Sequence, residues 1–185
     1  MKKYAQIFII ILIGYLIGDS IYTEMTKDKT PGKTKRLACQ EKVTTFERVF
    51  SNPEVKHAQR LIEHGNIEFT SSIEKSIYEE STLFNYTTLL ETNQIFNNSL
   101  HKYVKSNDKN DEKYHLSYYI YENDIKDPGK KTQKSKMYAG YVVLTVKNIN
   151  NKVIYKVQID FMDKQGSDIK ETIECTIESF MTVNK

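Results

Sequence analysis

The sequence contains no tryptophan, and its 185 residues include only 7 glycines, 3 prolines and 2 cysteines. It has no C-x-x-C motif and no Cys/His cluster, which argues against a zinc site. It also has no glycine-rich phosphate-binding loop, no G-x-S-x-G nucleophile motif and no H-E-x-x-H metalloprotease motif. We therefore predict no catalytic residue, no cofactor and no metal, and we expect that the protein is not an enzyme.

A strong charge of either sign is also missing. The net charge is +3 at pH 7, from 27 Lys and Arg residues against 24 Asp and Glu residues. The positive residues are spread along the chain instead of lying on one helix, so we expect no nucleic acid as a partner. The length suits one compact domain with its own core.

The first 23 residues combine a short positive head with an apolar run. Lys2 and Lys3 precede residues 7–18, all of which are apolar or glycine. A run of this length is typical of a signal-peptide core, whereas its continuation through Tyr22 gives the ~20 residues that a bilayer-spanning helix needs. We expect residues 1–23 to form a retained signal anchor, a single-pass transmembrane helix with the following domain outside the cytoplasm. The alternative is a cleaved signal peptide and a secreted protein.

Residues 24–44 are mostly polar and predict a linker, followed by a single α+β domain over residues 45–185. The two cysteines, Cys39 and Cys175, lie far apart in these two segments. In an oxidising compartment they could form one disulfide. The alternative is that Cys175 is a small buried residue on the apolar face of a strand.

Two helices are expected in the first half of this domain. Residues 51–65 have start signals at Asn52 and Pro53 and a stop signal at Gly65. A second, longer helix is expected within residues 83–104. Residues 66–81 are ambiguous, because their apolar residues fit both the period of a strand and that of a helix.

Alternating apolar and polar residues dominate the second half. They predict a hairpin over residues 136–168 and further strands over residues 114–120 and 169–177. Because four such strands follow one another with short links, we predict an antiparallel meander. The expected fold is α+β: an N-terminal membrane helix, one or two helices, then this four-stranded antiparallel meander, cystatin-like or related.

The loop that enters the predicted hairpin is rich in lysine. It contains Lys126, Lys130, Lys131, Lys134 and Lys136. As a flexible basic loop it could contact phospholipid or an acidic partner, and the alternative is that its lysines are only solvated.

Three stretches of the sequence resemble the cytochrome c oxidase assembly factor 1 family, which is related to a mitochondrial translocase subunit domain. They are SNPEVKHA at 51–58, the lysine-rich loop with its flanking strands at 116–147, and KVIYKVQID at 152–160. Members of that family pass from a strand through a Gly-Pro-Lys-Gly type loop into a strand pair. The resemblance implies a membrane-tethered, non-catalytic assembly factor, and no functional residue is carried over from it.

Together these observations predict a membrane-anchored, non-catalytic domain that binds another protein or assists complex assembly through its sheet or sheet edge. One alternative is a secreted soluble binding module or effector. Another is a small enzyme or ligand-binding domain, which would need a pocket between sheet and helices with Tyr118, Tyr141 or a histidine exposed inside it.

Overall fold

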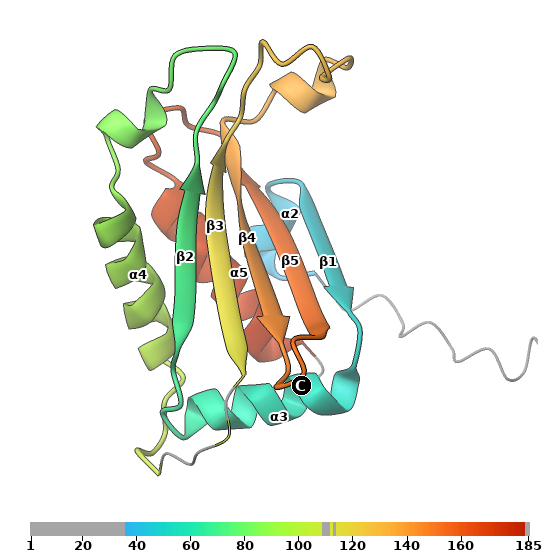
Figure 1. Cartoon of the computed structure of the whole chain (residues 1–185), viewed down its shortest axis with the longest axis vertical. Helices are drawn as coiled ribbons and strands as arrows, with labels where there is room; N and C mark the ends of the chain where they lie inside the picture. Colours follow the sequence, from blue (N-terminus) through green and yellow to red (C-terminus); the bar gives the residue numbers. More distant parts are fainter. Residues whose placement is uncertain (1–35, 109–111, 113, 184–185) are drawn as a thin grey trace, which may run out of the picture. The chain divides into compact units, whose positions relative to one another are not determined.

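The computed structural model describes residues 36–108, 112 and 114–183, and the strands of this part form one sheet. The strands are β1 (Thr45–Val49), β2 (Phe69–Glu74), β3 (His115–Glu122), β4 (Gly140–Lys147) and β5 (Val153–Phe161). Their order across the sheet is β1-β5-β4-β3-β2 (Figure 1). The pairs β1–β5, β5–β4 and β4–β3 are antiparallel, whereas β2 is parallel to β3.

The predicted hairpin is confirmed as the β4–β5 pair in the middle of the sheet. Val142, Leu144 and Val146 of β4 share the helix-covered face and are fully buried, and Val143 is fully buried on the opposite face. The turn between the strands is closed by Asn148, whose side-chain oxygen accepts a hydrogen bond from the backbone N–H of Lys152 (3.0 Å). Asn151 has a φ of 60°, a left-handed conformation that asparagine adopts more readily than most residues.

The predicted four-stranded antiparallel meander is wrong, because the sheet has five strands and is mixed. After β2 the chain runs through the helix α4 (Leu89–His101) and returns as β3 in the same direction. A helical crossover of this kind joins parallel strands, whereas a meander needs tight turns. β1, at the opposite edge, was not predicted, because its five residues are too few for a clear alternation. The expectation of a cystatin-like antiparallel sheet is therefore wrong as well.

The last predicted strand, over residues 169–177, is instead part of the helix α5 (Ile169–Thr182). Its apolar residues also recur at the helical spacing of four: Ile169, Ile173 and Ile177. The alternation assigned Thr172 and Thr176 to a wet strand face, but both are buried. Each donates its hydroxyl hydrogen bond to the backbone carbonyl four residues earlier (2.8 and 2.7 Å). Such bonds satisfy the hydroxyl inside the core, so a buried helix face can carry threonine.

The two helices predicted in the first half are present. α3 (Asn52–Glu63) has Ser51 at its cap position instead of the predicted Asn52, and Gly65 follows its last turn with a φ of 84°. α4 begins with a capping box, in which the N–H of Glu91 donates to the Thr88 hydroxyl and the Thr88 N–H donates to the Glu91 carboxylate. The shorter elements are α2 (Ala38–Glu41), η1 (Leu83–Asn85) and η2 (Lys134–Lys136).

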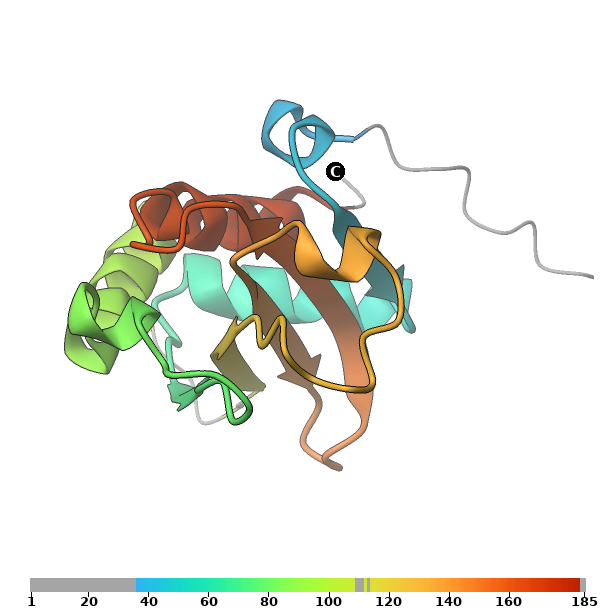
Figure 2. The ribbon, with the colours of Figure 1, turned by 90° about the horizontal axis from the view of Figure 1, so that it is seen from above.

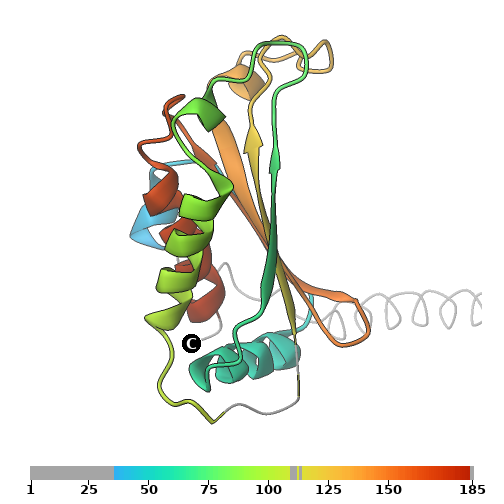
Figure 3. The same ribbon diagram turned by 60° about the vertical axis from the view of Figure 1, so that its left-hand side comes forward.

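The helices α4 and α5 pack side by side on one face of the sheet, as Figures 2 and 3 show. α5 lies over β4 and β5, and α3 crosses the end of the sheet where β4 finishes (Figure 1). Between helices and sheet, the ring of Phe96 stacks on that of Tyr118 with centroids 4.3 Å apart. Within the described part of the chain, no helix covers the opposite face of the sheet (Figure 3).

The predicted membrane helix over residues 1–23 lies outside the described residues, as do residues 24–35 of the predicted linker. Among the helices that are described, none is both long and apolar enough to cross a bilayer. The rest of the predicted linker, residues 36–44, contains α2 and belongs to the same compact unit as the sheet.

Candidate functional site

The helix-free face of the sheet carries a cluster of tyrosines. In β3 the buried residues Tyr118 and Ile120 alternate with the half-buried Tyr119 and Tyr121, which therefore point to the opposite face. Two further half-buried tyrosines, one in β4 and one just before it, join them. We call this surface the tyrosine face; it consists of Tyr119, Tyr121, Tyr138, Tyr141 and the loop residue Lys130.

Strand pairing brings the rings of the tyrosine face together. Tyr121 and Tyr141 are directly opposite each other in the β3–β4 register, and their rings stack with centroids 4.6 Å apart. Tyr119 meets Tyr141 edge-on at 6.2 Å, and Tyr138 lies at the same distance on a tilted plane. Tyr141 is thus the centre of the cluster, with a tyrosine on three sides.

Lys130 fixes the lysine-rich loop to this cluster. Its ammonium group lies 5.0 Å from the ring centroid of Tyr121 and 5.8 Å from that of Tyr138, within cation–π range. It donates hydrogen bonds to the Tyr121 hydroxyl (3.1 Å) and to the side-chain oxygen of Asn123. The Asn123 side chain in turn donates to the Tyr138 carbonyl (2.7 Å), so the loop and the rings form one bonded unit.

The phenols of Tyr141 and Tyr119 have raised pKa values. Burial raises the pKa of Tyr141 well above its ordinary value of 10.0, and the neighbouring tyrosines and Glu74 raise it further. Burial, followed by Glu74, also raises the pKa of Tyr119. A phenol that stays protonated can donate to a partner's carbonyl or carboxylate groups.

A buried carboxylate borders the tyrosine face. Asp160 of β5 lies opposite Tyr141 in the register and is only 4% exposed. Gln158 donates a hydrogen bond to it (3.2 Å), but burial prevails and raises its pKa above the ordinary value. No ion pair among the described residues includes Asp160. Burial therefore disfavours the ionised form of Asp160 in the folded protein.

Exposed aromatic residues continue this face towards the other edge of the sheet. Phe46 of β1 lies beside Gln158 in the register and is 62% exposed. The Arg48 guanidinium lies 4.8 Å from the ring centroid of Phe50, which is also exposed. The helix-free face thus carries aromatic side chains over β3 and β4 and on the edge strand β1.

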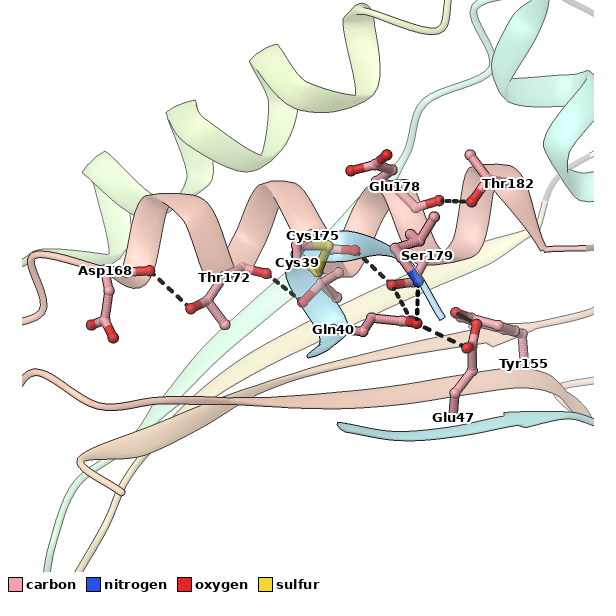
Figure 4. The surroundings of a disulfide bond; sticks show 12 residues. Cys39, Gln40, Glu47, Tyr155, Asp168, Thr172, Cys175, Glu178, Ser179 and Thr182 are labelled. Carbon is pink, nitrogen blue, oxygen red and sulfur yellow. Dashed lines mark hydrogen bonds between the residues drawn. A yellow bond between two sulfur atoms is a disulfide. The ribbon is translucent and has the colours of Figure 1, made fainter. Parts of the chain in front are cut away.

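On the helix-covered face, Cys39 of α2 and Cys175 of α5 form a disulfide with their Cα atoms 5.9 Å apart (Figure 4). The neighbouring Gln40 donates a hydrogen bond to the Ser179 hydroxyl (2.8 Å) and another to Glu47 (3.2 Å). Glu47 also accepts a hydrogen bond from Tyr155 (2.6 Å). The disulfide and these bonds tie α2, α5 and β1 together. The alternative that Cys175 lies on the apolar face of a strand is wrong, because Cys175 is in the helix α5.

The remaining candidate residues, the loop lysines and Tyr118, lie in different surroundings. Of the five loop lysines, Lys130 joins the tyrosine face, while Lys126, Lys131, Lys134 and Lys136 are exposed. Tyr118, one of the residues required by the enzyme alternative, is 1% exposed and packed in the core, so it is not available to a ligand. Its hydroxyl donates to Asn93 (2.6 Å) on α4.

Sequence reasoning missed the tyrosine face as a unit. The signal was present in part, because Tyr119 and Tyr141 alternate with the apolar residues of the predicted strands, and Tyr121 directly follows the predicted strand 114–120. Tyrosine fits either face of a strand, so the pattern alone did not distinguish them from Tyr118. The pairing register that places Tyr121 against Tyr141 joins strands on either side of a long loop, and it could not be derived from periodicity.

A scan of protein-family models finds no match to this chain, and no curated protein matches it. Among solved structures, it is similar to a dodecameric PelC variant from Paraburkholderia phytofirmans, with a TM-score of 0.40 and 13% sequence identity. The match covers 74% of this chain and 98% of the PelC chain. A TM-score this low supports no argument about function.

Proposed function

We propose that this protein is a non-catalytic protein-binding or complex-assembly domain whose contact surface is the tyrosine face. The observation that carries this proposal is the asymmetry of the sheet: helices cover one face, and the other bears four half-buried, mutually packed tyrosines. Tyrosine is enriched at protein interfaces, because its ring supplies apolar area while its hydroxyl supplies a hydrogen bond.

Preorganisation supports the same proposal. Binding is weakened by the entropy lost when side chains become ordered at an interface. The rings of Tyr121 and Tyr141 are already stacked, and the Lys130 ammonium already donates to the Tyr121 hydroxyl. Little further ordering is needed when a partner surface meets them.

We further propose that the domain works outside the cytoplasm. The Cys39–Cys175 disulfide supports this compartment, because disulfides persist in oxidising environments and are rare in the cytosol. Membrane attachment and secretion both fit it. Sequencing the amino terminus of the mature protein distinguishes the two: an intact Met1 with membrane fractionation indicates attachment, and a new terminus near Ile21 indicates secretion.

The contact surface is tested by purifying the tagged full-length chain from cells in mild detergent and quantifying the proteins that accompany it. Tyr121→Ser is expected to reduce the recovered partner at least tenfold, because interface tyrosines are frequent hot spots. Tyr86→Ser is the matched control, since Tyr86 is 60% exposed and lies outside the tyrosine face. Equal recovery with both variants, or no associated protein with the unmodified chain, would overturn the proposal.

A further inference from the structure

Exposed lysines without acidic partners gather at one end of the domain, where β2 and β3 finish and β4 begins. We call this the lysine end; its exposed lysines are Lys75, Lys126, Lys131, Lys134 and Lys136. None of them takes part in an ion pair with another described residue. The ion pairs found in the described part involve Lys102, Lys105 and His57 instead.

Most carboxylates near these lysines are turned inwards, onto backbone N–H groups. Glu122 accepts hydrogen bonds from the N–H groups of Thr82 and Leu83 (both 2.8 Å). Asp124 accepts from those of Ile77 and Tyr78 (2.7 and 2.5 Å). Glu79 accepts from the N–H of Ile125, and Asp127 accepts from the N–H of Gly129 at a half-buried position in the loop, while Glu74 and Glu80 are exposed. The outward-facing charge of this end is therefore mainly positive.

Apolar side chains project from the same end. Ile77 is 87% exposed in the loop between β2 and η1, and Tyr78 beside it is also exposed. This loop is held firmly, because the buried Asp124 binds the backbone of both residues and Glu122 binds the loop at Thr82. Met137, which follows η2, is a further exposed apolar residue in the neighbouring loop (Figure 1).

We propose that the lysine end docks on an anionic phospholipid surface, with the lysine ammonium groups on headgroup phosphates and Ile77 at the acyl boundary. A membrane interface offers an anionic layer and an apolar layer together, which is the combination that this end presents. An acidic protein surface would pair with the lysines but would leave Ile77 in water. The inference uses other residues than the proposed protein contact, although Lys130 joins the same lysine-rich loop to the tyrosine face.

The test uses the full-length chain with a single fluorescent label that responds to apolar surroundings. The label is attached through Ile77→Cys, or through Ile149→Cys as the matched control. Ile149 is also exposed, at 67%, but it lies in the β4–β5 turn at the other end of the sheet. Each labelled chain is mixed with vesicles of phosphatidylcholine alone or with one third phosphatidylglycerol. Any effect of the amino-terminal residues is the same in both labelled chains.

With anionic vesicles, the label at position 77 is expected to shift its emission to the blue and to be quenched by spin-labelled lipid. The label at position 149 should not respond. Each lysine near an anionic surface contributes about a fivefold factor in binding, so Lys126→Gln, Lys131→Gln and Lys134→Gln together should weaken docking about a hundredfold. Lys56→Gln, Lys147→Gln and Lys152→Gln remove the same charge at the other end and should have little effect.

Three results would overturn the proposal. They are equal responses from the labels at positions 77 and 149, equal responses to neutral and anionic vesicles, or equal effects of the two triple-lysine variants. A loss of partner recovery with Tyr121→Ser that leaves the lipid signal intact would show that the two surfaces act separately.

Discussion

The two faces of strand β3 use the same residue type in different ways. Tyr118 points towards the helices, where it is 1% exposed, stacks on Phe96 and donates its hydroxyl to Asn93. Tyr121, three residues later, stacks on Tyr141 at the half-buried, helix-free face. The core tyrosine is enclosed by other side chains and stabilises the fold, whereas the tyrosine on the open face keeps part of its surface exposed.

The buried carboxylates of Glu122 and Asp160 also differ, because their pKa values are shifted in opposite directions. Burial alone would raise the pKa of Glu122, but hydrogen bonds from the backbone of Leu83, Thr82 and Ser76 outweigh it, and the pKa is lowered. Asp160, beside the tyrosine face, has fewer donors, and burial raises its pKa. At neutral pH the two acids therefore affect stability in opposite directions.

The largest effect should come from removing the core tyrosine. Tyr118→Ala leaves a cavity beside Phe96 and strands polar groups of α4, so it should lower the free energy of unfolding by about 4 kcal/mol. Tyr121→Ala, on the half-exposed face, should lower it by about 1 kcal/mol. Urea unfolding followed by circular dichroism measures both. If the two variants lose equal stability, the division of roles between the faces is wrong.

Removal of the disulfide, which lies on the helix-covered side, should have the next largest effect on the free energy of unfolding. Cys39 and Cys175 are 136 residues apart, so their link strongly restricts the unfolded chain. Replacing both by alanine should cost about 3 kcal/mol in the free energy of unfolding. Partner recovery at a temperature where the variant is folded should remain unchanged. The reduced unmodified chain serves as the control and should unfold at a similar urea concentration.

Glu122 should make stability depend on acid. Its pKa is lowered on folding, so its contribution is fully present above the ordinary carboxyl value of 4.5 and is lost as the pH falls through the lower folded value. Glu122→Gln should cost about 2 kcal/mol at pH 7, because charged hydrogen bonds to the loop are lost. The cost should shrink below pH 4. A cost that is the same at pH 7 and pH 3 would show that the charge is not responsible.

Replacement of Asp160 should have the smallest effect on the free energy of unfolding, and it should stabilise the protein instead of destabilising it. Its pKa is raised on folding, so its ionised form is penalised at neutral pH and the penalty disappears as the pH falls through the folded value. Asp160→Asn should therefore raise the free energy of unfolding at pH 7 by about 1 kcal/mol, with no gain below the ordinary value of 3.8. Thermal unfolding across this pH range measures the difference, and a loss of stability at pH 7 would contradict it.

The sequence allowed the central hairpin, β3 and the helices α3 and α4 to be predicted, because their periods are long and their ends carry turn or capping residues. The failure at α5 came from residues such as Thr172 and Thr176, whose hydroxyl groups bond within the helix and which therefore do not report solvent exposure. The order of the strands depends on the pairing of β1 with β5 and of β2 with β3, which places β1 and β2 at opposite edges of the sheet. Those contacts join residues distant in the sequence, and no local pattern encodes them.

For the candidate site, the sequence identified the lysine-rich loop but not the surface that the loop reaches. Lys130 differs from its four lysine neighbours only in its three-dimensional position over Tyr121 and Tyr138. The two cysteines were recognised as a possible pair, yet their partners in space, such as Gln40 with Ser179, depend on the helix that was missed. Because residues 169–177 were predicted as a strand, the contacts that helix α5 makes on the helix-covered side could not be predicted.

Photocrosslinking in living cells tests most directly whether the helix-free face is the contact surface. A benzophenone amino acid is placed at Ser117 or Thr145 on that face, and at Gln94 or Glu171 on the exposed side of α4 or α5. We predict that light produces adducts with a partner protein from Ser117 and Thr145 and none from the helix positions. Adducts from Gln94 and Glu171 alone would contradict the account.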